Sequence, residues 1–106
     1  MTRRVVITGL GLVSPLGVGT ARTWEGLVAG RNGIAPITRF DVKDYDSRIA
    51  GEVKDFKPEE FMEKKDIRRL DPFMQYGIAA AKLAFDDSGL VVTDANAERI
   101  GCLVGS

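Results

Sequence analysis

Glycine and proline residues crowd the stretch that directly follows the first apolar run of the chain. That run, residues 4–8, is rich in β-branched side chains and stops at a glycine, which predicts a short buried strand. The residues that then interrupt regular structure are Gly9, Gly11, Pro15, Gly17 and Gly19. No signal peptide would tolerate these breaks in its apolar core. The chain is therefore expected to begin with a strand that ends in a glycine-rich loop.

Helices are predicted beyond this loop. Thr20 is placed to cap a first helix, and Gly30 is placed to end it. A longer helix is predicted to begin at residues 71–72, an aspartate and a proline, and to end at Gly89. We expect this long helix to be mostly buried through one apolar face, which comprises Phe73, Gly77, Ala80, Ala81 and Ala84 and is widened by Met74, Ile78 and Phe85.

The order of the elements predicts an α/β fold. Residues 31–57 lack periodicity and hold one short strand at 48–53, so they are expected to form an excursion and not a domain. Pro58 predicts the start of a polar helical turn. A second apolar run at 100–104 predicts another strand, so the two outer strands would form a parallel βαβ unit with a right-handed crossover. Two parallel strands do not make a stable sheet, so this architecture is expected to be incomplete.

Composition limits the partners and the chemistry that the chain can offer. Its 106 residues are 44% hydrophobic and 28% charged, which is typical of one soluble globular domain. The 15 basic and 15 acidic residues cancel, so neither nucleic acid nor a membrane is an expected partner. One cysteine and no histidine exclude an internal disulfide, a histidine-based triad and a zinc site. We expect a cytoplasmic protein with no metal.

Two short motifs invite a functional interpretation. Gly9 and Gly11 begin like a dinucleotide fingerprint, but Ser14 stands where the third glycine belongs and Pro15 follows where a helix should run. A tight backbone path is the favoured interpretation, and a nucleotide-binding α/β module is kept as an alternative. Cys102 lies in the second apolar run without a nearby cation or helix start to activate it. It is therefore expected to be a small buried side chain and not a nucleophile.

Four cations gather between the two helical segments of the second half. Drawn as a helix at about 100° per residue, they share one side, opposite Ile67 and Leu70. A charged helix face is usually only solvated, so this spacing alone leaves both solvation and partner binding open. We call the four residues the basic cluster: Lys64, Lys65, Arg68 and Arg69.

Four segments together resemble the beginning of a known enzyme family. They are residues 4–11 (RVVITGLG) with 14–17 (SPLG), residues 23–30, residues 71–77 and residues 99–106. In this order and at this spacing they cover nearly the whole chain. The chain thereby resembles the start of the elongating beta-ketoacyl synthases, the 3-oxoacyl-(acyl-carrier-protein) synthase family, with most similarity to the bacterial synthase II type.

The resemblance implies a thiolase-like α/β fold made of two similar halves. Residues 1–106 would be an incomplete part of the N-terminal domain, covering only its first βαβ portion. The implied activity is that of an acyltransferase of fatty acid biosynthesis: a cysteine takes the acyl chain, which is extended by decarboxylative Claisen condensation with malonyl-carrier-protein. The family's catalytic cysteine and two histidines have no counterpart here, so no catalytic residue is expected in this chain. A non-catalytic ketosynthase-like partner subunit is the alternative.

The resemblance also implies a partner for the basic cluster. Family members use cations at the positions of Lys65, Arg68 and Arg69 to bind acyl carrier protein, and Lys64 is expected to assist. Carrier proteins are acidic and bear a phosphopantetheine arm, so a cationic surface can steer their approach and pair with their anionic groups. No cofactor is implied, and the family normally forms homodimers.

Overall fold

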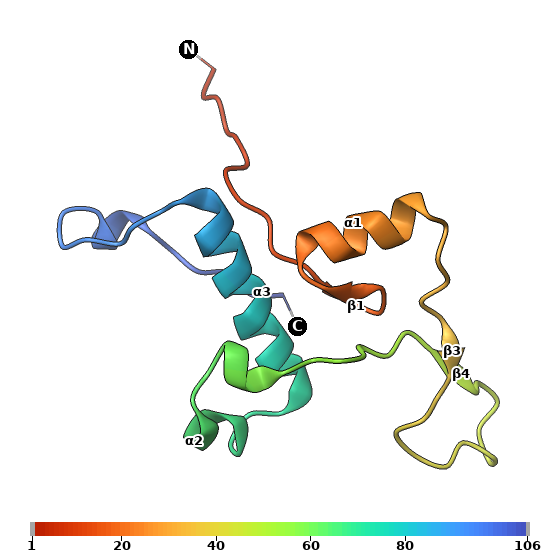
Figure 1. Cartoon of the computed structure of the whole chain (residues 1–106). Helices are drawn as coiled ribbons and strands as arrows, with labels where there is room; N and C mark the ends of the chain where they lie inside the picture. The colour runs from red at the N-terminus through yellow and green to blue at the C-terminus, as the bar shows by residue number, and fades with distance from the viewer. Residues whose placement is uncertain (1, 106) are drawn as a thin grey trace.

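The two-residue strands lie in the first half of the chain, and the regular structure described in the second half is helical (Figure 1). The computed structural model describes residues 2–105, so Ser106, which ends the family-like segment 99–106, lies outside the described part. The elements run in the order β1 (Val13–Ser14), β2 (Gly17–Val18), α1 (Thr20–Val28), β3 (Ala35–Pro36), β4 (Ile49–Ala50), η1 (Pro58–Glu60), α2 (Lys64–Ile67), α3 (Pro72–Ser88) and η2 (Ala97–Arg99). Figure 1 shows the start of the chain, near the N label, extending away from the helices.

Glycine and proline set four helix boundaries at the positions that the sequence predicts. Gly30 and Gly89 follow α1 and α3 in the left-handed conformation, with φ of 64° and 65°. Glycine adopts this conformation without the steric cost of a Cβ, so it ends both helices. Pro58 and Pro72 occupy the first turns of η1 and α3, where the missing N–H costs no hydrogen bond.

The start of α1 differs from the prediction. Gly19, with φ of 102°, is the residue that precedes the helix, and Thr20 is already its first helical residue. The prediction that Thr20 caps α1 is therefore wrong. Its hydroxyl instead donates to the carbonyl oxygen of Leu10 at 3.1 Å, which fastens the preceding loop to the helix.

The predicted loop before α1 closes into a small antiparallel hairpin of β1 and β2. Ser14 pairs with Gly17, and its Oγ lies 2.8 Å from Oγ1 of Thr23, which is only 6% exposed. Ser14 Oγ also donates to the Gly17 carbonyl oxygen and accepts a hydrogen bond from the Leu16 backbone nitrogen, both at 3.2 Å. The contact between the two hydroxyls thus gives the buried Thr23 side chain a hydrogen-bond partner, and it joins the family-like SPLG segment to α1.

The predicted parallel βαβ unit is not formed. Residues 4–8 and 100–104 are not strands, and Val5 and Leu103 are 92% and 99% exposed. In the described part of the chain, the ladders are the antiparallel pairs β1–β2 and β3–β4. A strand needs a hydrogen-bonded neighbour, and a parallel sheet also needs cover on both faces. Within the described residues, the two apolar runs have neither a neighbouring strand nor cover on both faces. The α/β character of this chain therefore rests on its helices and small antiparallel sheets.

Helix α3 is less buried than its apolar composition predicts. Phe73, Ile78 and Phe85, all on the face expected to be covered, are 57%, 41% and 44% exposed. Ala79 is the one fully buried apolar residue among residues 2–105. The prediction of a mostly buried helix is therefore wrong for this chain, because no other element covers the large side chains of that face.

The backbone at Gly9 and Gly11 runs directly against α3. A Cβ added at Gly11 would overlap the carbonyl oxygen of Ala80 and stand 2.5 Å from the nitrogen of Ala84. A Cβ added at Gly9 would overlap the Ala84 carbonyl oxygen and stand 2.7 Å from Cβ of Ser88. Both glycines are thus needed for the close approach of the backbone to the helix. This confirms the interpretation of these glycines as a tight backbone path.

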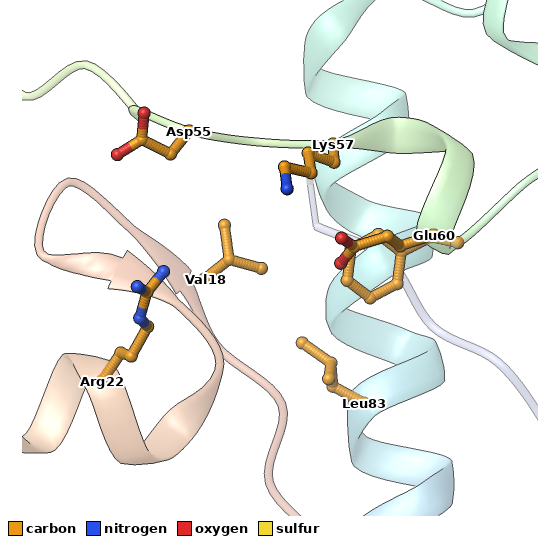
Figure 2. A pocket seen from close by; sticks show the side chains of 7 residues that line it. Val18, Arg22, Asp55, Lys57, Glu60 and Leu83 are labelled. Carbon is orange, nitrogen blue, oxygen red and sulfur yellow. The ribbon is translucent and has the colours of Figure 1, made fainter.

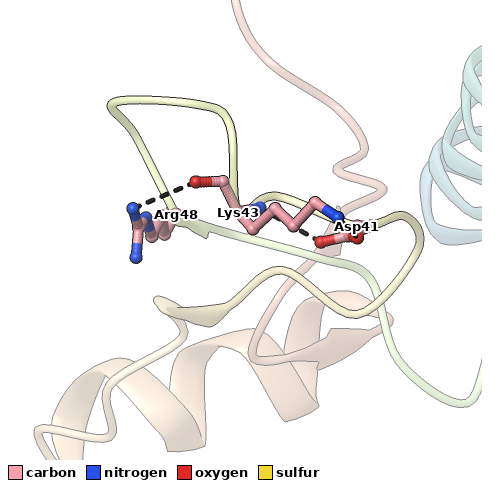
Figure 3. Close-up of polar contacts among 3 residues, drawn as sticks. All are labelled: Asp41, Lys43 and Arg48. Atoms are coloured by element: carbon pink, nitrogen blue, oxygen red, sulfur yellow. Dashed lines mark hydrogen bonds and ion pairs between the residues drawn. The ribbon is translucent and has the colours of Figure 1, made fainter.

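Residues 31–57 form the excursion that the sequence predicts. The strand predicted at 48–53 is confirmed only over β4, which pairs with β3. Figure 3 shows the tip of the excursion. There the Lys43 backbone nitrogen donates to Oδ1 of Asp41, and Nη2 of Arg48 donates to the Lys43 backbone carbonyl oxygen, both at 3.1 Å. Local polar contacts therefore shape this tip.

Two further contacts hold the excursion in place. The Glu52 carboxylate accepts hydrogen bonds from the Thr38 hydroxyl at 2.8 Å and from the Thr38 and Arg39 backbone nitrogens at 3.1 and 3.3 Å. The bonds from Thr38, its hydroxyl first, lower the pKa of Glu52 below its ordinary value. Nη2 of Arg39 donates to the Tyr76 hydroxyl on α3 at 2.6 Å, and the Tyr76 ring meets Phe56 edge-on at 4.9 Å between centroids.

The chain as a whole is extended. Its radius of gyration is 17.1 Å, whereas a compact domain of this length would have about 13 Å. Large apolar side chains accordingly stay exposed at both ends and along α3. Within residues 2–105, no helix combines the length and the apolar character that crossing a membrane requires.

Candidate functional site

The basic cluster lies on α2 and on the turn that leaves it. Glu63 precedes α2 in an extended conformation, and its carbonyl oxygen accepts hydrogen bonds from the nitrogens of Asp66 and Ile67 at 2.9 and 3.1 Å. Beyond α2 the helical path continues, because the Asp66 backbone carbonyl oxygen accepts hydrogen bonds from the backbone nitrogens of Arg69 and Leu70 at 2.9 and 3.0 Å. One continuous helical turn therefore presents all four cations.

The orientation of this turn is the one that the sequence predicts. All four residues of the basic cluster are exposed, whereas Ile67 and Leu70 are half-buried on the other side. The apolar pair anchors the turn, and the long cationic side chains reach into solvent. The structure thus brings the four sequence-predicted site residues together on one surface.

Most of the cationic charge in the cluster is not neutralised by neighbouring side chains. Lys65 Nζ lies 2.9 Å from Oε2 of Glu63, with both side chains at least 70% exposed. Such an exposed pair contributes about 0–1 kcal/mol and is easily exchanged for another anion. Among residues 2–105, Lys64, Arg68 and Arg69 form no ion pair. The cluster therefore offers cations that an anionic partner can approach.

Gln75 is part of this site, although the sequence interpretation missed it. It lies in the first turns of α3, and its side-chain nitrogen donates to the carbonyl oxygens of Ile67 at 3.2 Å and Leu70 at 2.8 Å. Its local pattern gave no signal, because a glutamine near a helix start is common in any exposed helix. Only the fold shows that its amide reaches back to the turn that carries the basic cluster.

A charged cavity of about 500 Å³ lies between α1, the segment that follows β4, and α3 (Figure 2). Arg22, Asp55, Lys57 and Glu60 line it together with apolar side chains. Figure 2 shows Arg22 on α1 and the other three along one continuous segment that leads into η1. The cavity could not be predicted, because its residues are far apart in the sequence. Its charges are of both signs, so it selects neither anions nor cations. Residues 2–105 contain no group of three metal-ligating side chains here or elsewhere.

Cys102 is not buried, contrary to the prediction. It is a free, exposed cysteine, because residues 100–104 have no neighbouring strand to cover them. It borders an open apolar groove of about 570 Å³ beside α3. No cation or histidine adjoins it in the residues that line this groove, so nothing there would activate the thiol as a nucleophile.

Comparisons with known proteins place the chain in a family. Residues 2–106 match the family model described as beta-ketoacyl synthase, N-terminal domain. The chain is 50% identical over 104 residues to a 3-oxoacyl-(acyl-carrier-protein) synthase 2 of Vibrio harveyi, and 48% and 47% identical to proteins of the same name from Coxiella burnetii and Staphylococcus aureus. Each match covers 98% of this chain and 25% of the relative, so the chain spans about a quarter of their length.

A solved structure agrees with the sequence matches. The chain superimposes on the structure of the ishigamide ketosynthase/chain length factor with a TM-score of 0.75 and 43% sequence identity. The superposition covers 84% of this chain and 22% of that chain. With the family model matching almost every residue, the chain belongs to the beta-ketoacyl synthase family and matches the N-terminal domain of that family.

Proposed function

We propose that residues 1–106 are the incomplete N-terminal part of an elongating 3-oxoacyl-(acyl-carrier-protein) synthase of the thiolase-like fold. The observation that carries this proposal is the identity of about half of the residues, over 98% of the chain, with synthases of that name. The exposed apolar runs at 4–8 and 100–104 support it, because they suit strands whose sheet is completed by other parts of a longer protein. Cytoplasmic location and homodimerisation belong to the same proposal.

The proposed reaction is a decarboxylative Claisen condensation. Malonyl-carrier-protein loses carbon dioxide, and the resulting enolate attacks an acyl group held as a cysteine thioester. A carbon–carbon bond forms, the bond from the acyl carbon to sulfur breaks, and the cysteine thiolate leaves. Because the chain has no histidine and its one cysteine is not activated, the groups that perform these steps would come from outside residues 1–106.

The contribution of this chain would be to bind the carrier protein through the basic cluster. The cluster is exposed, and three of its four cations form no ion pair in the described part of the chain. An acidic carrier with a phosphopantetheine arm provides carboxylates and a phosphate for Arg68, Arg69 and Lys65, assisted by Lys64. Guanidinium groups suit this role because they can pair with carboxylates and phosphates in a bidentate manner.

A second candidate is a non-catalytic ketosynthase-like partner subunit. The superimposed structure is named for a chain length factor beside a ketosynthase, which supports keeping this candidate. A nucleotide-binding module is less well supported, because α3 occupies the space against which Gly9 and Gly11 lie. The glycines therefore cannot offer their backbone to a pyrophosphate there.

One assay separates the first two candidates. The complete protein, purified alone, is given an acylated carrier protein and malonyl-carrier-protein, and both carbon dioxide release and the elongated product are measured. If the protein is a synthase, we expect carbon dioxide and the elongated product in equal amounts. Elongation that appears only after a second, cysteine-bearing subunit is added would instead support the partner subunit.

A further inference from the structure

Gln75 connects the long helix α3 to the turn that carries the basic cluster. A helix of four residues leaves nearly all its carbonyl oxygens without an intrahelical partner. The Gln75 side-chain nitrogen donates to two of the carbonyl oxygens at this end, those of Ile67 and Leu70. A glutamine amide has two N–H groups, so each carbonyl can receive its own hydrogen.

The two carbonyls flank the arginines of the basic cluster. Arg68 and Arg69 are the only residues between Ile67 and Leu70, so one side chain holds the backbone on both sides of them. The Gln75 backbone nitrogen in turn donates to the Asp71 carbonyl oxygen at 3.1 Å, within the first turn of the 17-residue helix α3. The arginine pair is thereby tied to the most extensive helix of the chain.

A single helical turn would not keep this geometry by itself. Helix formation has a costly first turn, so an isolated four-residue helix is marginal in water. Binding through arginines also costs the entropy of ordering their side chains, and a fixed backbone lowers that cost. From this geometry we propose that Gln75 is a positioning residue, which holds Arg68 and Arg69 in the orientation that binds the carrier protein. This inference rests on the docking role proposed above.

The test uses the complete synthase with two substrates, an acyl group on the carrier protein and the same acyl group on pantetheine. The variant Gln75→Leu removes both hydrogen bonds, and Gln75→Asn keeps the amide but shortens its reach. We expect Q75L to raise KM for the carrier-bound substrate about threefold to tenfold, with kcat and the pantetheine KM unchanged. Q75N should raise the same KM by a smaller factor. If Q75L does not fold, Q75N takes its place in the test.

Further variants complete the experiment. Lys82→Leu places the same leucine at an exposed position of α3 whose side chain makes no hydrogen bond in residues 2–105, so it should leave both KM values unchanged. Arg68→Ala should raise KM for the carrier-bound substrate. Adding Q75L to the double variant R68A/R69A, in which both positioned side chains are removed, should raise that KM by no more than about twofold. Non-additivity of this kind is what action through the two arginines requires.

The outcomes separate the two proposals. If R68A raises KM for the carrier-bound substrate but Q75L and Q75N do not, the positioning role is wrong and docking stands. Equal losses on both substrates in the Gln75 variants, or a full additional effect of Q75L in the R68A/R69A background, would also overturn the positioning role. If R68A itself leaves the carrier-bound KM unchanged, the docking proposal fails and the role of Gln75 fails with it.

Discussion

The backbone nitrogen of Leu10 donates to Oδ2 of Asp87 at 2.8 Å, which joins two residues 77 positions apart in the sequence. On either side of Leu10, Gly9 and Gly11 lie so close to α3 that neither has room for a Cβ. The hydrogen bond and the two glycines therefore form one contact, through which residues 9–11 are held against the second half of α3.

The glycine contact predicts that Gly11→Ala destabilises the complete protein by about 2 kcal/mol. The added Cβ would meet the backbone at Ala80 and Ala84, and backbone atoms cannot move aside as a flexible side chain can. Urea unfolding of wild type and variant measures the difference. An unchanged unfolding midpoint would mean that residues 9–11 do not lie against α3 in the complete protein.

The extended shape predicts that residues 1–106 alone do not unfold cooperatively. Ala79 is the one fully buried apolar side chain in the described part, and the runs at 4–8 and 100–104 have no strand neighbours. Apolar burial is the main source of stability, so a chain that buries so little cannot offset the entropy lost on folding. We expect a gradual change of circular dichroism with urea, and a sharp single transition would refute this.

The Glu52 contact predicts a pH effect on stability. Hydrogen bonds from Thr38 hold the pKa of Glu52 below its ordinary value of 4.5, so the contact stabilises the folded state above that pH. This stabilisation is lost as the pH falls below 4.5 through the lower folded-state pKa. Glu52→Gln should therefore lower the stability of the complete protein at pH 7 and weaken the decline in stability below pH 4.5.

Glu59 provides the control for this measurement. It is exposed and makes no side-chain hydrogen bond or ion pair within residues 2–105. Glu59→Gln should leave the stability at pH 7 unchanged. If E52Q and E59Q give the same stability at each pH, the Thr38 contact does not stabilise the fold.

The sequence was most informative where a local signal decides the structure. Pro72 begins α3 and Gly89 ends it as predicted, because each acts through its own backbone conformation. The outward face of the basic cluster was predicted for a similar reason, since helical periodicity depends only on near neighbours.

The predictions that failed depend on partners far away in the sequence. Residues 4–8 and 100–104 have strand composition, but a strand exists only where another strand pairs with it. The exposure of Phe73 and Cys102 has the same origin, because burial requires an element that covers the side chain. Gln75 was missed because its hydrogen bonds to Ile67 and Leu70 depend on the angle at which α2 meets α3.

Charge reversal at Arg68 tests the central claim, that the basic cluster binds an acyl carrier protein for a condensing enzyme. The measurement is kcat/KM of the complete synthase for carrier-bound and pantetheine-bound acyl groups, in wild type, Arg68→Glu and Lys65→Glu. Lys43→Glu, on the exposed tip of the excursion, is the control for a general charge effect. Because an anion placed opposite an acidic partner repels it, R68E and K65E should lower the carrier-bound value about tenfold or more. The pantetheine value and both values of K43E should stay within about twofold of wild type, whereas equal losses on both substrates would contradict the claim.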